Sequence, residues 1–231
     1  MSNKKPLVIS IELSQHKGSV AARLGNGEIV EIAVMQGDRK KDAMMPALEK
    51  AVTTVGGNPN EIDTIFVSIG PGSFTGLRVA VATTKMLSYT TRATIIPIKT
   101  ALGVVCADKE HVPKSIVVSA IKKENFWLSV VTKNPKWNCE GRLVNASQLP
   151  LYIEQNTVLY CDSLLTDEIT KMCTEAGVTL REMQSTATSI MAVGSTLGDK
   201  NHIDPALLLP LYPREPEAVR MWKEARSSTT E

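Results

Sequence analysis

The sequence predicts an α/β protein of two lobes, and three observations lead to this prediction. Three short apolar runs joined by tight turns open the chain. Helical and strand-like patterns then alternate as far as residue 107. A charged stretch containing a proline, residues 108–114, is followed by a degraded repeat of the same order. We therefore expect a first lobe over residues 1–108 and a smaller second lobe over 109–231, whose C-terminal segment returns to the first.

The three opening runs are expected to form an antiparallel meander. The first run is apolar and rich in isoleucine and valine, which is typical of a buried strand. The second and third runs are separated by Gly25-Asn26-Gly27, whose residues tolerate the positive φ of a hairpin turn. The expected strands are residues 7–13, 19–24 and 28–35.

Helices and strands alternate through the rest of the first lobe. In the first expected helix, Met44, Leu48 and Val52 recur at helical spacing, and a Gly-Gly-Asn-Pro stretch follows its end. A turn rich in glycine and proline then separates a short apolar strand from the next helix. The expected elements are a helix over residues 42–55, a strand over 64–69, a helix over 77–90, a strand over 93–97 and a short helix over 100–107.

The second half repeats this rhythm with shorter elements. Two apolar runs bracket Lys122-Lys123-Glu124-Asn125 and indicate a hairpin. Near the end, residues 206–214 are apolar with two prolines, which predicts an extended segment packed on the body. The other expected elements are strands over residues 115–121, 126–132, 137–144, 157–160 and 178–181, and helices from 145 or 147 to 154 and over 163–176 and 189–197.

Three hairpin strands followed by alternating helices and strands form the half-domain of the actin-like and Hsp70-like folds. This ribonuclease H-like layout is the architecture we expect for the first lobe, and the smaller second lobe repeats it in degraded form. It is an analogy of pattern and predicts no activity, because one fold hosts many functions.

Composition excludes several classes of function. The formal charge is +2 and aromatic residues make up 4%, so we expect neither a long basic face nor a stacking platform for single-stranded nucleic acid. The four cysteines contain no CxxC, and the three histidines lie far apart, which predicts reduced thiols and no metal site. No signal peptide or membrane span is evident, so we expect a cytoplasmic protein.

The turn between the strand over 64–69 and the helix over 77–90 is the first candidate site. Backbone N–H groups of such a turn, at the positive end of a helix, can hold an anion. The GxGxxG and GxxxxGK[ST] fingerprints are both absent. The alternative is a tight turn that seats the helix on the sheet, with Ser73 or Thr75 as its cap. The candidate nucleotide-binding residues are Gly70, Gly72, Ser73, Thr75 and Gly76.

The literal string SIGPGSFTGLR, residues 68–78, closely resembles the signature of the TsaB (YeaZ) family. Residues 7–35 resemble that family's first strand and hairpin, and LLPLYPREPEA, residues 208–218, resembles its closing P-x-Y-x-R segment. Residues 110–205 match mainly by the order of elements.

The resemblance implies an actin-like fold and a cytoplasmic scaffold for the catalytic subunit TsaD, which forms threonylcarbamoyladenosine in tRNA. TsaE, an ATPase, is the third member, so ATP and Mg²⁺ belong to the partner complex and tRNA is met only through it. TsaB-like proteins also form homodimers through the helix after the hairpin and the helix after the glycine turn. No cofactor and no catalytic residue of this chain itself is implied.

Two positions depart from the family pattern. Members carry Asp in a D-x-S/T motif of the first strand, where this chain has Glu12-Leu13-Ser14. Many carry His-Ser before the first helix, where this chain has Lys40-Lys41. Because Glu is one methylene longer than Asp, these departures weaken the case for an independent metal or phosphoryl-transfer site.

The helix over 77–90 is the candidate partner surface. Its small residues permit close helix approach, while its larger apolar residues spread around more than one face. One face must meet the sheet; the other meets either the helix over 42–55 or a second polypeptide, and both hold in a four-helix contact. The expected interface residues are Met44, Met45, Leu48, Val79, Ala82, Thr83 and Met86.

Three functional hypotheses follow. The favoured one is a non-catalytic partner of a TsaD-like enzyme. The alternative is an autonomous ATP-binding phosphotransferase of the actin-like class, which predicts nucleotide between the lobes and loss of activity on Gly72→Val. A peptidase would need a nucleophile with its base or a set of metal ligands, and the sequence supplies neither.

Overall fold

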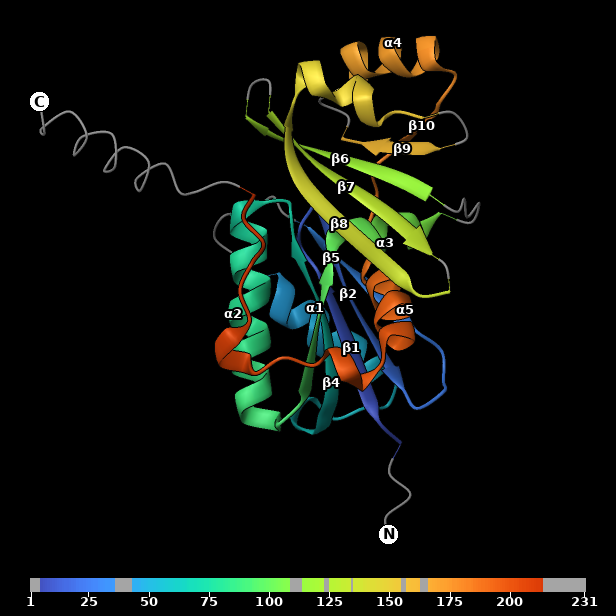
Figure 1. The fold of residues 1–231 in the computed structure, drawn as a ribbon. Coiled ribbons are helices and arrows are strands. Elements are labelled where there is room, and N and C mark those ends of the chain that lie inside the picture. The colour runs from blue at the N-terminus through green and yellow to red at the C-terminus, as the bar shows by residue number, and fades with distance from the viewer. Residues whose placement is uncertain are drawn as a thin grey trace, which may run out of the picture.

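The computed structural model contains two five-stranded mixed sheets with helices on both faces of the first (Figure 1). This architecture confirms the predicted two-lobed α/β fold. The described residues are 5–35, 43–108, 114–122, 125–133, 135–154, 157–162 and 166–213.

The first sheet has the strand order β3-β2-β1-β4-β5. Strands β1, β2 and β3 form the predicted antiparallel meander, and β4 and β5 continue the sheet in parallel. Strand β4 is longer than predicted at both ends, because Ile62 pairs with Leu7 and Gly70 pairs with Lys99. The strands are β1 (Leu7–Glu12), β2 (Lys17–Leu24), β3 (Val30–Met35), β4 (Ile62–Gly70) and β5 (Thr94–Lys99).

Two helices cover each face of this sheet. Helices α1 (Met44–Thr54) and α2 (Phe74–Thr91) share a core with Ile9 and Ile11 of β1. Helices α3 (Thr100–Ala107) and α5 (Ala187–Leu197) share a core with Val8, which points to the opposite face, and with residues of the second sheet. In the described part of the chain, no helix combines the length and apolar character needed to cross a bilayer.

The second sheet has the order β10-β9-β6-β7-β8, and α4 packs on its far face (Figure 1). The predicted helix ending at residue 154 is instead a 3₁₀ helix, η2 (Ala146–Tyr152), which Asn145 caps and in which Pro150 lies. The remaining elements are β6 (Lys114–Lys122), β7 (Asn125–Lys133), β8 (Trp137–Asn145), β9 (Val158–Cys161), α4 (Thr166–Ala176) and β10 (Thr179–Glu182).

The chain returns to the first lobe with α5. The Ser10 hydroxyl donates to the carbonyl of Ala187 at 2.7 Å, and the Ala187 amide donates to the Ser19 hydroxyl at 2.8 Å. Residues 203–213, which we call the strap, then run beside α2 (Figure 1). The strap follows η4 (Asp199–Asn201) and contains η5 (Pro205–Leu207). Its Ile203 amide bonds to Ile95, and its Leu211 amide bonds to the Ile69 carbonyl at 2.7 Å.

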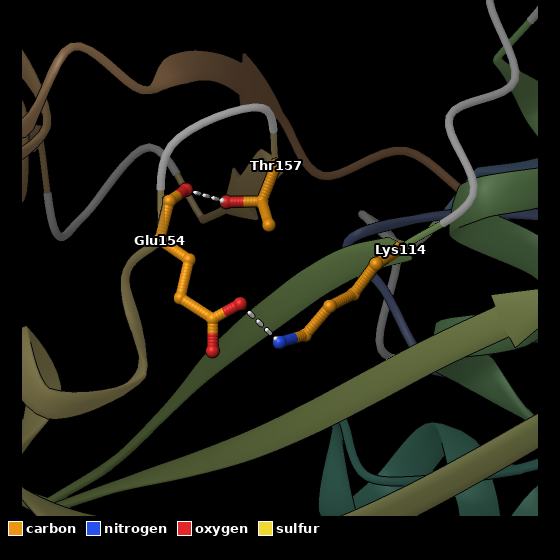
Figure 2. Close-up of polar contacts among 3 residues, drawn as sticks. All are labelled: Lys114, Glu154 and Thr157. Carbon is orange, nitrogen blue, oxygen red and sulfur yellow. Dashed lines mark hydrogen bonds and ion pairs between the residues drawn. The ribbon is translucent and has the colours of Figure 1, made fainter.

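Figure 2 shows an ion pair where the second sheet begins: Lys114 Nζ lies 2.7 Å from the Glu154 carboxylate. The Thr157 hydroxyl donates to the Glu154 carbonyl at 2.6 Å, which connects the start of β9 to the same residue. Both charged side chains are accessible to solvent, so the ion pair contributes little to stability.

We accordingly expect Lys114→Ala to lower the free energy of unfolding by less than about 1 kcal/mol. Chemical denaturation of the variant and the parent protein measures the difference. A loss well above this value would mean that the ion pair fixes the edge of the second lobe.

Candidate functional site

The glycine turn between β4 and α2 packs against this chain's own β1–β2 turn. The Ser73 amide donates to the Ser14 carbonyl at 2.6 Å. A Cβ at Gly72 would lie 2.7 Å from Ser14 Cβ and closer still to the Ser14 carbonyl oxygen. Gly70 has a φ of +105°, a conformation that residues with a side chain rarely adopt. The absence of side chains at Gly70 and Gly72 therefore allows two segments of this chain's backbone to pack closely against each other.

Helix α2 starts at Phe74, three residues earlier than predicted, because Ser73 caps it. The Ser73 hydroxyl accepts a hydrogen bond from the Gly76 amide at 3.3 Å. Of the other candidates in this turn, Gly70 and Gly76 are buried, whereas Gly72 and Thr75 are exposed. The Ser73 and Gly76 amides, two of the donors an anion would need, are thus engaged by Ser14 and Ser73.

Glu12 lies at the end of β1 and is completely buried. Its carboxylate accepts hydrogen bonds from the Ser14 amide at 2.6 Å and the Ser185 hydroxyl at 2.9 Å. Burial raises the pKa of the Glu12 carboxyl, and the bonds from Ser14 and Ser185 oppose that rise. Among the described residues, no three His, Cys, Asp or Glu side chains gather as metal ligands would. Through the bond from Ser185, the Glu12 side chain links the end of β1 to the segment that precedes α5.

The raised pKa of Glu12 gives a pH-dependent prediction. The folded protein binds the Glu12 proton more tightly than the unfolded chain does. The stability that Glu12 adds through this difference is therefore fully present below the ordinary pKa of 4.5, and it is lost as pH rises through the pKa of the folded state. A Gln side chain can still accept from the Ser14 amide and can donate to the Ser185 hydroxyl. We expect the parent protein to lose stability relative to Glu12→Gln as pH rises from about 4 to 8, measured by denaturant unfolding.

Ser185→Ala is the companion variant, because it removes one bond that favours the ionised carboxylate. It should raise the pKa of Glu12 further and extend the pH range over which stability falls. A stability difference between the parent and Glu12→Gln that is the same at every pH would refute this account.

A small hollow lies where α3 ends beside the second sheet. It encloses about 180 Å³ and is lined partly by Asp108, Tyr160, Arg181 and Gln184. Asp108 pairs with Arg181 and accepts from the Tyr160 hydroxyl at 2.8 Å. Burial, with this bond, raises the pKa of Tyr160 to about 12. Ligand pockets usually enclose roughly 300–1,000 Å³, so this hollow is small for a nucleotide.

Helix α2 presents an apolar stripe to solvent. Val79 is 40% exposed, Met86 51% and Tyr89 66%; Ala82 lies between them and is also exposed. These four residues, spaced by three, four and three positions, lie on one side of the helix. Thr83 borders the stripe and is half-buried. The opposite side of α2 packs on the first sheet through Leu77, Ala80, Val81, Thr84 and Leu87.

The three residues predicted for the α1 part of the interface lie mostly inside the lobe. Met44 and Leu48 are each 3% exposed because they pack on the first sheet, whereas Met45 is half-buried. An apolar groove of about 250 Å³ lies between α1 and α2. The groove is lined by Met45, Pro46, Leu48, Glu49, Val52, Pro59, Ile62 and Leu87. Of the predicted interface, the α2 residues and Met45 are therefore the accessible part, beside this groove.

Sequence reasoning missed four exposed apolar residues around α2. Tyr89 continues the spacing of Ala82 and Met86 by one turn, so the helical pattern could have found it. Phe74 stacks with Tyr212 of the strap at 5.2 Å between ring centres. Leu207 and Leu209 are 67% and 68% exposed on either side of Leu208, which is buried in the core. Nothing in an apolar run of this length tells which leucine points inward.

Residues 37–134 match the family model described as TsaD: tRNA N6-adenosine threonylcarbamoyltransferase. The match spans less than half of the chain and contains α1, the glycine turn and α2. The sequence matches no curated protein.

Solved structures match over nearly the whole chain. YeaZ from Pseudomonas aeruginosa superposes with a TM-score of 0.74 and 13% identity, covering 89% of this chain and 100% of that one. A second structure, of an uncharacterised protein with similarity to peptidase YEAZ from Pseudomonas aeruginosa, gives 0.73 and 13% over 90% and 100%. At this identity the likeness concerns the fold. Together with the family model, it confirms the resemblance to TsaB (YeaZ) carried by residues 68–78.

Proposed function

We propose that this chain, which combines the YeaZ fold with the glycine-turn signature, is a non-catalytic partner subunit of a TsaD-like enzyme. That enzyme transfers a threonylcarbamoyl group to adenosine 37 of tRNA. In this proposal the chain works in the cytoplasm, and ATP, Mg²⁺ and tRNA are bound by the other members of the complex, a TsaD-like subunit and a TsaE-like ATPase.

The observation that carries the proposal is the exposed stripe of α2 beside an apolar groove. A helix face bearing Val79, Met86 and Tyr89 in water is costly unless a partner covers it. Methionines at 45 and 86 suit a contact surface because thioethers adapt to a partner's shape. The stripe follows directly on the glycine turn, which seats α2 firmly on the sheet.

Three further observations favour a partner over an independent phosphotransferase. The Ser73 and Gly76 amides of the glycine turn are engaged within the chain, and the Glu12 carboxylate is buried with two donors of its own. The hollow beside Asp108 is also small for a nucleotide. Only the actin-like layout favours the phosphotransferase, and a fold by itself does not establish an activity.

The test is to mix the purified chain with the TsaD homologue of the same organism and measure the mass of the complex by light scattering. We expect a stable complex, and we expect threonylcarbamoyladenosine formation by the complete set of proteins to depend on this chain. Calorimetry of the chain alone with ATP and Mg²⁺ is the second arm. Failure of the chain to bind the TsaD homologue would refute the partner role. Binding and turnover of ATP by the chain alone would favour the phosphotransferase.

We also propose that a second copy of the chain uses the same surface, giving a homodimer through α1 and α2. One surface cannot hold two partners at once, so the homodimer and the TsaD complex should exclude each other. Adding the TsaD homologue to a concentrated sample should replace the dimer mass with that of the heterocomplex. Persistence of the dimer within the larger assembly would require a different dimer surface.

A further inference from the structure

The exposed apolar surface of the described residues is concentrated around α2. Nine large apolar side chains are exposed in that part of the protein, and seven of them lie on α2 or the strap. They are Phe74, Val79, Met86, Tyr89, Leu207, Leu209 and Tyr212. Such a concentration marks a surface that something covers at least part of the time.

The strap ends at the edge of this exposed apolar surface of α2. Tyr212 stacks on Phe74 in the first turn of α2, and the Leu211 amide is bonded to Ile69 just before the glycine turn. The described part of the strap therefore ends beside the first turn of α2, and residues 214–231 are tethered there. Helix α2, with 18 residues, is about 27 Å long, and the 18 residues of 214–231 can span up to about 60 Å. Every position of the stripe lies within their reach.

The composition of residues 214–231 complements this surface. The segment carries the apolar residues Val219, Met221 and Trp222, and its four acidic residues are balanced by four basic ones, of which Arg220 lies between the apolar residues. Helix α2 has no Asp or Glu, and its charged side chains, those of Arg78 and Lys85, are both basic. Because the segment carries no net charge, its match to the stripe rests on these apolar side chains, and Glu217 and Glu224 are groups that can meet the basic charges of α2.

We propose that residues 214–231 bind back onto the α2 stripe and compete with the protein partner for it. The competition rests on the proposed function, whereas the intrachain contact itself does not. A segment tethered next to its target acts at a high effective concentration, so even a weak contact is populated. Partner binding then has to displace the segment, and its apparent affinity falls by the fraction of uncovered molecules.

The first experiment compares the full-length chain with its Val219→Ser/Trp222→Ser variant in binding to the TsaD homologue. If the segment covers about nine molecules in ten, the variant should bind about tenfold more tightly. Thr229→Ser/Thr230→Ser is the control and should bind like the parent. Removal of residues 214–231 should act like the double variant. A gain below about twofold, or weaker binding, would overturn the competition.

The second experiment needs no partner. Subtracting the emission of a Trp222→Phe variant from that of the parent isolates Trp222. Its quenching by acrylamide is then compared with and without Met86→Asp in the same chain. We expect Trp222 to be shielded in the parent and to become more quenchable with Met86→Asp. Equal quenching in both would refute the intrachain contact. This readout separates its failure from a failure of the proposed function, because it holds even if the TsaD homologue does not bind.

Discussion

Replacing Met86 with aspartate is expected to weaken binding to the TsaD homologue at least about 100-fold, or about 2.7 kcal/mol. Met86 lies in the stripe and is 51% exposed, so the free protein, in which the same variant also releases residues 214–231 from the stripe, can hold the new carboxylate in water. In the complex the same carboxylate would be buried against an apolar partner surface without a counter-charge, which costs several kcal/mol. Calorimetric titration of the variant and the parent measures the change.

Leu151→Asp is the matched control for this prediction. Leu151 is 77% exposed on η2 of the second lobe, far from α2 in the fold, so its replacement makes an equivalent chemical change elsewhere. We expect it to leave both affinity and threonylcarbamoyladenosine formation unchanged. If Met86→Asp binds as tightly as the parent, or if Leu151→Asp abolishes binding, the interface does not lie on α2.

Gly72→Ala is expected to destabilise the protein by about 2–3 kcal/mol and to lower its melting temperature by about 5–10 °C. The new methyl group would overlap the backbone of Ser14, and a backbone, unlike the end of a flexible side chain, cannot move aside locally. The bond from the Ser73 amide to Ser14 would be strained as well. Thermal and chemical denaturation measure both quantities.

Ser73→Ala calibrates this effect at the neighbouring residue. It removes the cap of α2 without adding volume, so it should cost about 1 kcal/mol, less than Gly72→Ala. A Gly72→Ala protein as stable as the parent would mean that the turn is not held against Ser14. The same geometry shows that loss of activity on Gly72→Val could not identify a phosphotransferase, since the larger side chain would disrupt the turn itself.

Much of the fold could be predicted from local patterns. The meander, the alternation of helices and strands and the cap of α2, for which Ser73 is one of two candidates, each depend on a few neighbouring residues, and local patterns predict them close to their observed positions. The prediction was least accurate where a distant contact decides the local structure. Strand β4 extends because Leu7 and Lys99 pair with its ends, and η2 replaces a predicted helix around Pro150.

The candidate site divides in the same way. The helical spacing of Val79, Ala82 and Met86 could be recognised in the sequence, yet the same spacing on α1 placed Met44 and Leu48 at a surface although they are buried. An amphipathic pattern shows that a helix has an apolar face without showing what covers that face. For α1 the sheet covers it, whereas α2 is apolar on both sides and the sheet can cover only one.

The sequence by itself therefore determined the order of elements, the two-lobed class and the glycine turn with its family resemblance, because these depend on residue type and short spacing. Only the tertiary structure decided that the turn closes on Ser14, that Glu12 is buried under Ser185 and that Leu207 and Leu209 face outward. Glu12 and Ser185 are 173 residues apart. Which groups meet over such distances depends on the packing of whole sheets and helices, and no local pattern encodes it.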